Sequence, residues 1–102
     1  MQPFTKKVVE TIRKIPAGRV MTYGQIARVA GSTRAAHQVV RILHSMSRKH
    51  HLPWHRVINS KGQISLQDDA LYQEQLLSLE AEGIEVRVNG TIDLQKYQYL
   101  ND

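Results

Sequence analysis

The first part of the chain carries apolar residues at helical spacing. They recur every three or four positions, at Phe4, Val8, Ile12 and Ile15. This period predicts an amphipathic helix with one buried face. Pro3 suits the first helical turn, where its missing N–H costs nothing, and the Pro16-Ala17-Gly18 segment should end the helix.

A shorter helix is predicted next, over roughly residues 23–30. Thr22 and Gln25 have the spacing of a capping box, in which each side chain accepts a hydrogen bond from the other residue's backbone N–H. Gly31 can adopt the left-handed conformation that closes such a helix. The segment should therefore form a helix with a defined start and end.

A third helix is expected to run through Met46, capped by Ser32 or Thr33. Its buried side would be formed by Ala36, Val39, Val40 and Leu43. Two helices that meet across a glycine-containing turn are typical of a helix-turn-helix, although such pairs also occur in proteins that do not bind DNA.

The second half of the chain has a mixed pattern. Pro53 blocks a further helix, and residues 57–58 and 64–66 can pair as a short hairpin across the turn at residues 59–62. Asp68 or Asp69 can cap a helix that ends at Gly83. The apolar residues of that helix include Leu71, Leu76 and Leu79.

The C-terminal segment is expected to contain one more strand. Ile84, Val86 and Val88 alternate with polar residues, which predicts a brief strand that ends at an Asn89-Gly90 turn. Tyr97 and Tyr99 fall in a polar tail. The pattern as a whole indicates a mostly helical protein with little sheet.

The charge distribution indicates a polyanionic partner. The 102 residues carry a net charge of +5, and twelve of the fourteen Lys and Arg residues lie in residues 1–61, whereas the acidic residues gather in residues 62–102. An excess of positive charge favours a nucleic acid as the partner, and the first part of the chain should contact it. Many basic domains, however, bind no nucleic acid.

The length and amino-acid composition of the chain exclude several classes of protein and of site. The chain fits one domain, residues 1–102, and it contains no cysteine, which excludes disulfides, thiolate chemistry and sulfur-based zinc sites. His50, His51 and His55 lie close together, but Pro53 breaks their spacing and no carboxylate cluster accompanies them, so we expect neither metal nor cofactor. No membrane span or leader pattern is found, and we expect a soluble, cytoplasmic protein, nucleoid-associated in a bacterium or nuclear in a eukaryote.

Five short segments carry a more specific signal. They are Ile15-Pro16-Ala17-Gly18-Arg19-Val20, Thr22-Tyr23-Gly24-Gln25-Ile26-Ala27, Arg34-Ala35-Ala36, Pro53-Trp54-His55-Arg56-Val57-Ile58 and Glu82-Gly83. In this order and spacing they resemble the C-terminal, active domain of the O6-alkylguanine-DNA alkyltransferases along nearly the whole chain. The resemblance implies an α+β, mostly helical fold: a single winged helix-turn-helix domain whose third helix enters the minor groove.

One residue separates this chain from the active enzymes. The alkyltransferases carry a Pro-Cys-His-Arg motif, and Trp54 occupies the position of the reactive cysteine. Alkyl transfer requires a thiolate to attack the alkyl carbon from roughly 3–3.5 Å, and an indole has no comparable nucleophile. The chain is identified as a member of the alkyltransferase-like branch, which implies binding of O6-alkylguanine by nucleotide flipping without alkyl transfer. We therefore expect no enzymatic activity.

The resemblance also implies roles for individual residues. The lesion pocket is expected to contain Tyr23, Trp54, His55, Val57, Ser65 and Gln67. Glu82 would support this pocket by orienting His55. Trp54 would otherwise be an ordinary core residue, but on the pocket floor it can stack on a base for about 1–3 kcal/mol, comparable with the cost of flipping. Contacts to the DNA backbone are expected from Arg19, Thr22, Ser32, Thr33, Arg41 and Arg56.

Two positions depart from the family pattern. His37 stands where the family usually has an arginine finger that fills the hole left by the flipped base. Arg34, three residues earlier and expected on the same helical surface, is a second candidate for this filler. Gln67 stands at or near the place where some alkyltransferase-like proteins use a basic residue to sense the modified guanine, and it brings no charge.

The resemblance implies a cellular role as well. A stable complex with DNA containing O6-alkylguanine would mark the lesion for nucleotide excision repair proteins, with the chain acting as a monomer. An alternative of a different class is a sequence-specific winged-helix regulator without lesion recognition. Residual transferase or glycosylase activity through His55 and Glu82 is the third possibility.

Overall fold

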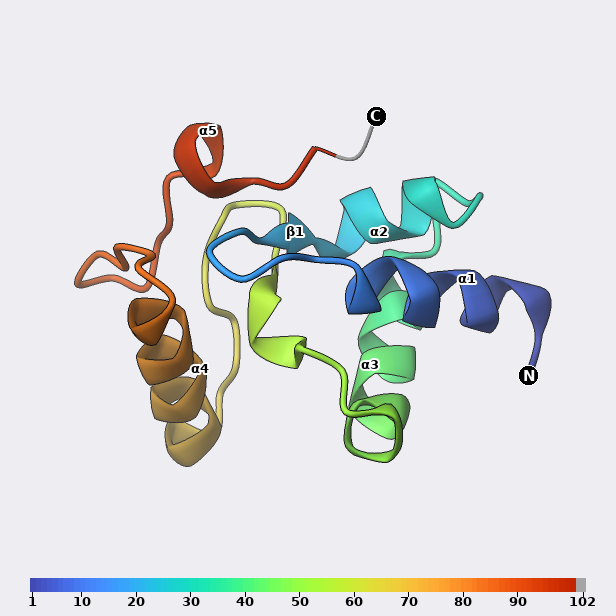
Figure 1. Ribbon diagram of the computed structural model, residues 1–102, viewed down its shortest axis with the longest axis horizontal. Helices are drawn as coiled ribbons and strands as arrows, with labels where there is room; N and C mark the ends of the chain where they lie inside the picture. The colour runs from blue at the N-terminus through green and yellow to red at the C-terminus, as the bar shows by residue number, and fades with distance from the viewer. Residues whose placement is uncertain (101–102) are drawn as a thin grey trace.

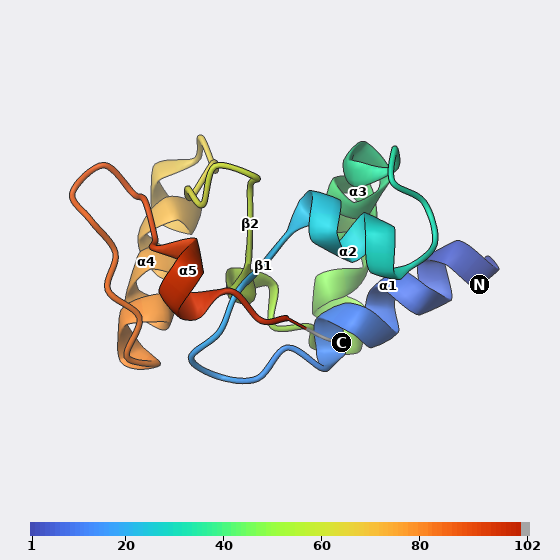
Figure 2. The same cartoon turned by 90° about the horizontal axis from the view of Figure 1, so that it is seen from above.

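The arrangement of the elements was taken from a computed structural model that describes residues 1–100. Figures 1 and 2 show α1, α2 and α3 on one side of the molecule and α4 and α5 on the other, and Figure 2 shows β1 and β2 between them. In chain order the elements are α1 (Pro3–Arg13), β1 (Met21–Thr22), α2 (Tyr23–Val29), α3 (Ala36–His50), the 3-10 turn η1 (Trp54–Arg56), β2 (Val57–Ile58), α4 (Asp69–Ala81) and α5 (Leu94–Tyr97). No helix among residues 1–100 is long and apolar enough to cross a membrane.

Two apolar cores meet at the strands. β1 and β2 run parallel, with Met21 opposite Val57 and Thr22 opposite Ile58. Successive strand residues point to opposite faces. Met21 and Val57 therefore pack into a first core with α1 to α3. Val20 and Ile58 pack into a second core with residues of α4 and α5. The small sheet joins the two halves of the molecule.

The predicted starts of the first two helices are confirmed. Pro3 lies in the first turn of α1. The Thr22 hydroxyl accepts from the Gln25 N–H at 3.1 Å, and the Gln25 side-chain oxygen accepts from the Thr22 N–H at 3.3 Å. Gly31 has a φ of 108° and lies just beyond α2. This capping box fixes where the first helix of the helix-turn-helix begins.

The third helix begins and ends later than predicted. The expected Ser32 or Thr33 cap is wrong, because α3 starts at Ala36 with no side-chain cap. Residues 32–35 form the turn instead, held by the Ser32 N–H bond to the Ala27 carbonyl at 2.9 Å. The helix continues to His50, and His51 ends it in the left-handed conformation with a φ of 51°.

Val40 was expected to be buried, and this expectation is also wrong. Val39 and Leu43, four residues apart, are buried and fix the inner side of α3. Consecutive residues of a helix lie about 100° apart around its axis. Val40 is consequently turned away from the core, and it is 41% exposed.

The predicted hairpin does not form. Its turn is present, because the Asn59 side chain accepts from the N–H groups of Lys61 and Gln63 at 3.0 and 2.9 Å. The flanking segments, however, find other partners: β2 pairs with β1, and Gln63 forms an antiparallel bridge with Thr91. Short apolar segments have no strong preference for one pairing partner, and residues 57–58 are buried as a strand beside β1.

The helix α4 follows its prediction closely. Asp68 is the N-cap, and its carboxylate accepts from the Leu71 N–H at 3.1 Å. The helix ends at Ala81, and Gly83 adopts a φ of 85° two residues later. The local start and stop signals of this helix therefore decided its bounds.

The C-terminal segment differs from its prediction in two ways. Residues 84–88 form no strand, and Val88 is fully exposed, although the turn that follows closes through the Gly90 N–H bond to the Arg87 carbonyl at 2.8 Å. Tyr97 lies in no polar tail: it is buried in the second core. Val20 bonds through its backbone to Tyr97 and Tyr99 at 2.9 and 2.7 Å, so this segment is built into the fold.

Candidate functional site

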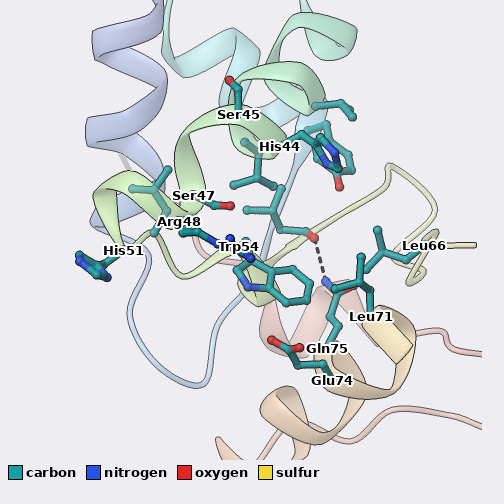
Figure 3. Close-up of a pocket in the computed structure, with 15 residues that line it drawn as sticks. His44, Ser45, Ser47, Arg48, His51, Trp54, Leu66, Leu71, Glu74 and Gln75 are labelled. Atoms are coloured by element: carbon teal, nitrogen blue, oxygen red, sulfur yellow. Dashed lines mark hydrogen bonds between the residues drawn. The ribbon is translucent and has the colours of Figure 1, made fainter. Parts of the chain in front are cut away.

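A cavity of about 820 Å³ opens between α3 and α4. Figure 3 shows Trp54 of η1 between the two helices, with side chains of α3 on one side and of α4 on the other. Tyr23, Trp54 and Val57, three of the predicted pocket residues, line this cavity. Its volume falls in the range of roughly 300–1,000 Å³ that ligand pockets usually have.

The other predicted pocket residues lie elsewhere. His55 does not line the cavity, because its ring turns toward Glu82. Ser65 and Gln67 are exposed, and the half-buried Leu66 between them lines the cavity instead. Side chains of an extended segment alternate between faces. This segment therefore contributes Leu66 to the cavity, and the expected lesion contacts of Ser65 and Gln67 stay predictions.

The turn that carries Trp54 has a local cause. After His51 ends α3, Pro53 brings a fixed φ and no N–H, so the chain cannot continue as a helix. The Trp54 N–H bonds to the Leu52 carbonyl at 2.8 Å, and the Arg56 N–H bonds to the Pro53 carbonyl at 3.0 Å. This tight turn projects the indole into the cavity between the helices.

Gln75 of α4 fixes the far side of this turn, and sequence reasoning missed it. Its side-chain amide donates to the carbonyls of His55 and Val57, both at 3.0 Å, and the residue is 3% exposed. The bond to Val57 is the dashed line of Figure 3. A signal was available, because Leu71, Gln75 and Leu79 form one stripe of α4, and a polar residue on an apolar stripe needs buried partners.

A second network holds η1 from behind. Glu82, the C-cap residue of α4, accepts from the His55 ring at 2.7 Å and from the Arg56 guanidinium at 2.6 Å. It also accepts from the Gly18 N–H at 3.1 Å, and Arg56 donates further to the Ile15 carbonyl at 2.8 Å. The predicted support of His55 by Glu82 is present. Arg56, in contrast, is committed to these internal partners, which leaves its expected contact to DNA without support.

The ionisation of Glu82 follows from the same contacts. Burial acts to raise the pKa of Glu82, but the hydrogen bonds from Arg56, His55 and the Gly18 N–H outweigh it and lower the pKa to about 2. The carboxylate is therefore charged at neutral pH. Its oxygens already accept hydrogen bonds from Arg56, His55 and the Gly18 N–H, so the charge stabilises η1 through these partners.

Tyr23 contributes an intact phenol to the cavity wall. It is the first residue of α2, placed there by the Thr22 cap. Burial raises the pKa of Tyr23 above its ordinary value, so the hydroxyl keeps its proton. A rigid aromatic ring with a polar tip is suited to press on a nucleotide and to hydrogen-bond to it.

The exposed face of α3 is basic and leads into the cavity. His37, Arg41, His44 and Arg48 are all exposed and lie four, three and four residues apart, so they form one stripe along the helix. His44 and Arg48 line the cavity, and His37 and Arg41 continue the stripe toward the start of the helix. Arg34 precedes α3, so the expectation that it shares this helical surface is wrong.

The remaining residues expected to contact DNA differ in exposure. Arg19 and Thr33 are exposed, and Ser32 is half-buried in the turn between α2 and α3. Thr22 is 7% exposed and its hydroxyl caps α2, which gives it a structural role instead. The three neighbouring histidines separate: His50 packs near α1, His51 lines the cavity and His55 binds Glu82.

Comparison of the sequence with known proteins shows the family of this chain. Residues 3–84 match the family described as 6-O-methylguanine DNA methyltransferase, DNA binding domain. The chain is 46% identical over 96 residues to the DNA base-flipping protein of Escherichia coli (strain K12), with 94% of this chain and 74% of that protein covered. It is 45% identical over 87 residues to alkyltransferase-like protein 1 of Schizosaccharomyces pombe, with 84% and 81% covered. The chain belongs to the alkyltransferase-like family.

Solved structures agree with this assignment. The crystal structure of S. pombe Atl1 in complex with damaged DNA containing O6-carboxymethylguanine matches with a TM-score of 0.88 and 39% identity, covering 99% of this chain and 98% of that chain. A single-residue variant of the Mycobacterium tuberculosis O6-methylguanine methyltransferase matches with a TM-score of 0.62 and 25% identity, covering 93% and 55%. The expected fold class is confirmed. This alkyltransferase-like chain holds no cysteine and has Trp54 in its cavity, so it offers no thiol to accept an alkyl group.

Proposed function

We propose that this chain binds O6-alkylguanine in duplex DNA, holds the flipped nucleotide in the cavity between α3 and α4, and leaves the alkyl group in place. The observation that carries the proposal is Trp54 on the cavity wall, within a motif whose enzymatic form has cysteine there. An indole supplies a flat surface for a base and no nucleophile. The relative crystallised with O6-carboxymethylguanine DNA has nearly the same fold, which supports this choice of ligand.

The stripe on α3 supports entry of this helix into the minor groove. His37 and Arg41 extend from the cavity wall toward the helix start, so DNA that follows the stripe places its target base at Trp54. Arg41 is suited to a phosphate, and His37 is suited to fill the space of the flipped base. Arg34 lies outside this stripe, and we assign it to the DNA backbone with Arg19, Ser32 and Thr33.

The assignment of His37 gives a direct test of flipping. His37→Ala should lower affinity for an O6-methylguanine duplex about fivefold or more, because the stacking of an aromatic ring on bases is typically worth about 1–3 kcal/mol. It should also reduce the fluorescence gain of a 2-aminopurine placed beside the lesion. Gln38→Ala, an exposed neighbour on another side of α3, is the matched control. A larger effect for Arg34→Ala than for His37→Ala would transfer the role to Arg34.

We propose further that the chain acts as a monomer and that its stable complex marks the lesion for nucleotide excision repair. A bound protein with a flipped nucleotide distorts the duplex far more than a small alkyl group does. Loss of the protein should then raise sensitivity to alkylating agents in cells with working excision repair and leave repair-deficient cells unchanged. Equal sensitisation of both strains would separate this chain from that pathway.

A further inference from the structure

Two oppositely charged side chains face each other across the cavity. Arg48 comes from the last turn of α3 and Glu74 from α4, and both line the cavity. Figure 3 shows the Trp54 indole with Arg48 on its α3 side and Glu74 on its α4 side. Both residues are exposed, and within residues 1–100 neither side chain forms an ion pair or a hydrogen bond with another residue. Both side chains can therefore form hydrogen bonds or ion pairs with a ligand.

The position of Glu74 is set by its helix. Leu71, Glu74 and Gln75 share one side of α4, because residues three and four apart are neighbours on a helix. Gln75 anchors that side to η1 through its two bonds at 3.0 Å. These bonds fix the backbone of α4 next to η1, and Figure 3 shows the Glu74 side chain on the same side of the cavity as Gln75.

The size of the cavity leaves room for more than a methyl group. Its 820 Å³ is near the upper end of the usual range for ligand pockets, roughly 300–1,000 Å³. A base that contacts Trp54 brings its O6 substituent into the same space. A longer substituent then reaches the region between Arg48, a donor, and Glu74, an acceptor.

We propose that Arg48 and Glu74 determine which O6 substituents this chain prefers, and that the best-matched class ends in an uncharged hydroxyl. Such a group accepts from Arg48 and donates to Glu74 at the same time. A carboxylate end is attracted by Arg48 but repelled by Glu74, and an ammonium end meets the opposite pair of forces. This inference rests on the proposed function, because it assigns the alkyl substituent to that cavity.

The test compares four duplexes that differ only in the guanine substituent: methyl, 2-hydroxyethyl, carboxymethyl and 2-aminoethyl. Binding of all four duplexes is measured at one salt concentration and one pH, because both conditions change the affinity of a basic protein for DNA. The wild-type chain should bind the hydroxyethyl duplex most tightly among the three polar substituents.

Glu74→Gln should strengthen binding of the carboxymethyl duplex and weaken that of the aminoethyl duplex, each about two- to fivefold, as expected for exposed charges. Arg48→Gln should do the reverse. For each variant, binding of the methyl duplex serves as the reference, which cancels the general effect of protein charge on DNA affinity.

Glu80→Gln is the matched control for Glu74, since it removes an exposed charge from α4 outside the cavity. Lys49→Gln serves in the same way for Arg48. If Glu74→Gln and Glu80→Gln change the ratio of carboxymethyl to aminoethyl affinity equally, the inference is overturned. Failure of the proposed function itself appears separately, in a fifth duplex with unmodified guanine, as wild-type affinity equal to that for the methyl duplex.

Discussion

Trp54→Ala is expected to lower affinity for an O6-methylguanine duplex roughly 5- to 150-fold and to change affinity for the unmodified duplex far less. The range corresponds to the typical value of about 1–3 kcal/mol for a base stacked on an aromatic side chain. In the proposed binding mode, affinity for unmodified DNA comes mainly from the exposed basic stripe of α3, which this change leaves intact. Equilibrium titrations of both duplexes at the same salt concentration give the two losses.

The controls for this result separate stacking from folding. Trp54 also packs against the first core, so the melting temperature of the variant must be measured alongside its affinity. Trp54→Phe keeps an aromatic face and should retain much of the lesion preference. Equal losses for the two duplexes would show that Trp54 acts through the fold and has no particular contact with the lesion.

Glu82→Gln is expected to cost up to about 3 kcal/mol of unfolding free energy at pH 7, because solvent at the partly exposed carboxylate weakens the full effect of its pKa shift. Its pKa of about 2 in the folded chain lies below the ordinary value of 4.5. A lowered carboxyl pKa stabilises the fold when the group is ionised, and a tenfold change in the acid dissociation constant corresponds to about 1.36 kcal/mol. The substitution removes the charge that binds Arg56 and His55.

The pH dependence of this effect has a definite sign. The stabilisation by Glu82 is fully present once the pH is well above 4.5, and it is lost as the pH falls from there through the folded-state pKa of about 2, below which the wild-type carboxyl is protonated as well. Urea unfolding at several pH values should therefore show the wild-type and Glu82→Gln curves converging at low pH. Glu80→Gln, an exposed change two residues earlier, should stay within about 0.5 kcal/mol of wild type throughout. A constant difference between the Glu82→Gln and wild-type curves would rule out the charge as its source.

Trp54 and Glu82 both belong to the structure around η1. Two side chains of the α4 region, Gln75 and Glu82, support this turn in different ways. η1 presents Trp54 to the cavity, Gln75 holds its carbonyls from α4, and Glu82 holds its basic side chains from the end of that helix. The His55–Glu82 contact at 2.7 Å has no thiol to act on in this chain, and together with the Arg56–Glu82 bonds it fixes the turn.

The sequence predicted those features that short segments decide by themselves. The Thr22–Gln25 capping box and the Asp68 cap have their partners within a few residues, and both are present as predicted. The family match then supplied the fold, because several such segments in fixed order are far more specific than any one of them.

Several of the failures share a physical origin in long-range contacts. Residues 57–58 had a plausible local partner but pair with β1, some 36 positions earlier in register, and Tyr97 was assigned to a tail although it closes the second core. Gln75 has its bonding partners only because α4 lies against η1. A hydrophobic pattern specifies which face is buried, and it does not specify what covers that face.

The central claim is tested most directly by equilibrium binding of the wild-type chain to two duplexes that differ only by guanine or O6-methylguanine, followed by assay of the methyl group. At one fixed salt concentration, we expect tighter binding to the lesion and full recovery of the methyl group on the DNA. Equal affinities would contradict lesion recognition and favour a sequence-specific regulator, and loss of the methyl group from the DNA would contradict the non-catalytic assignment.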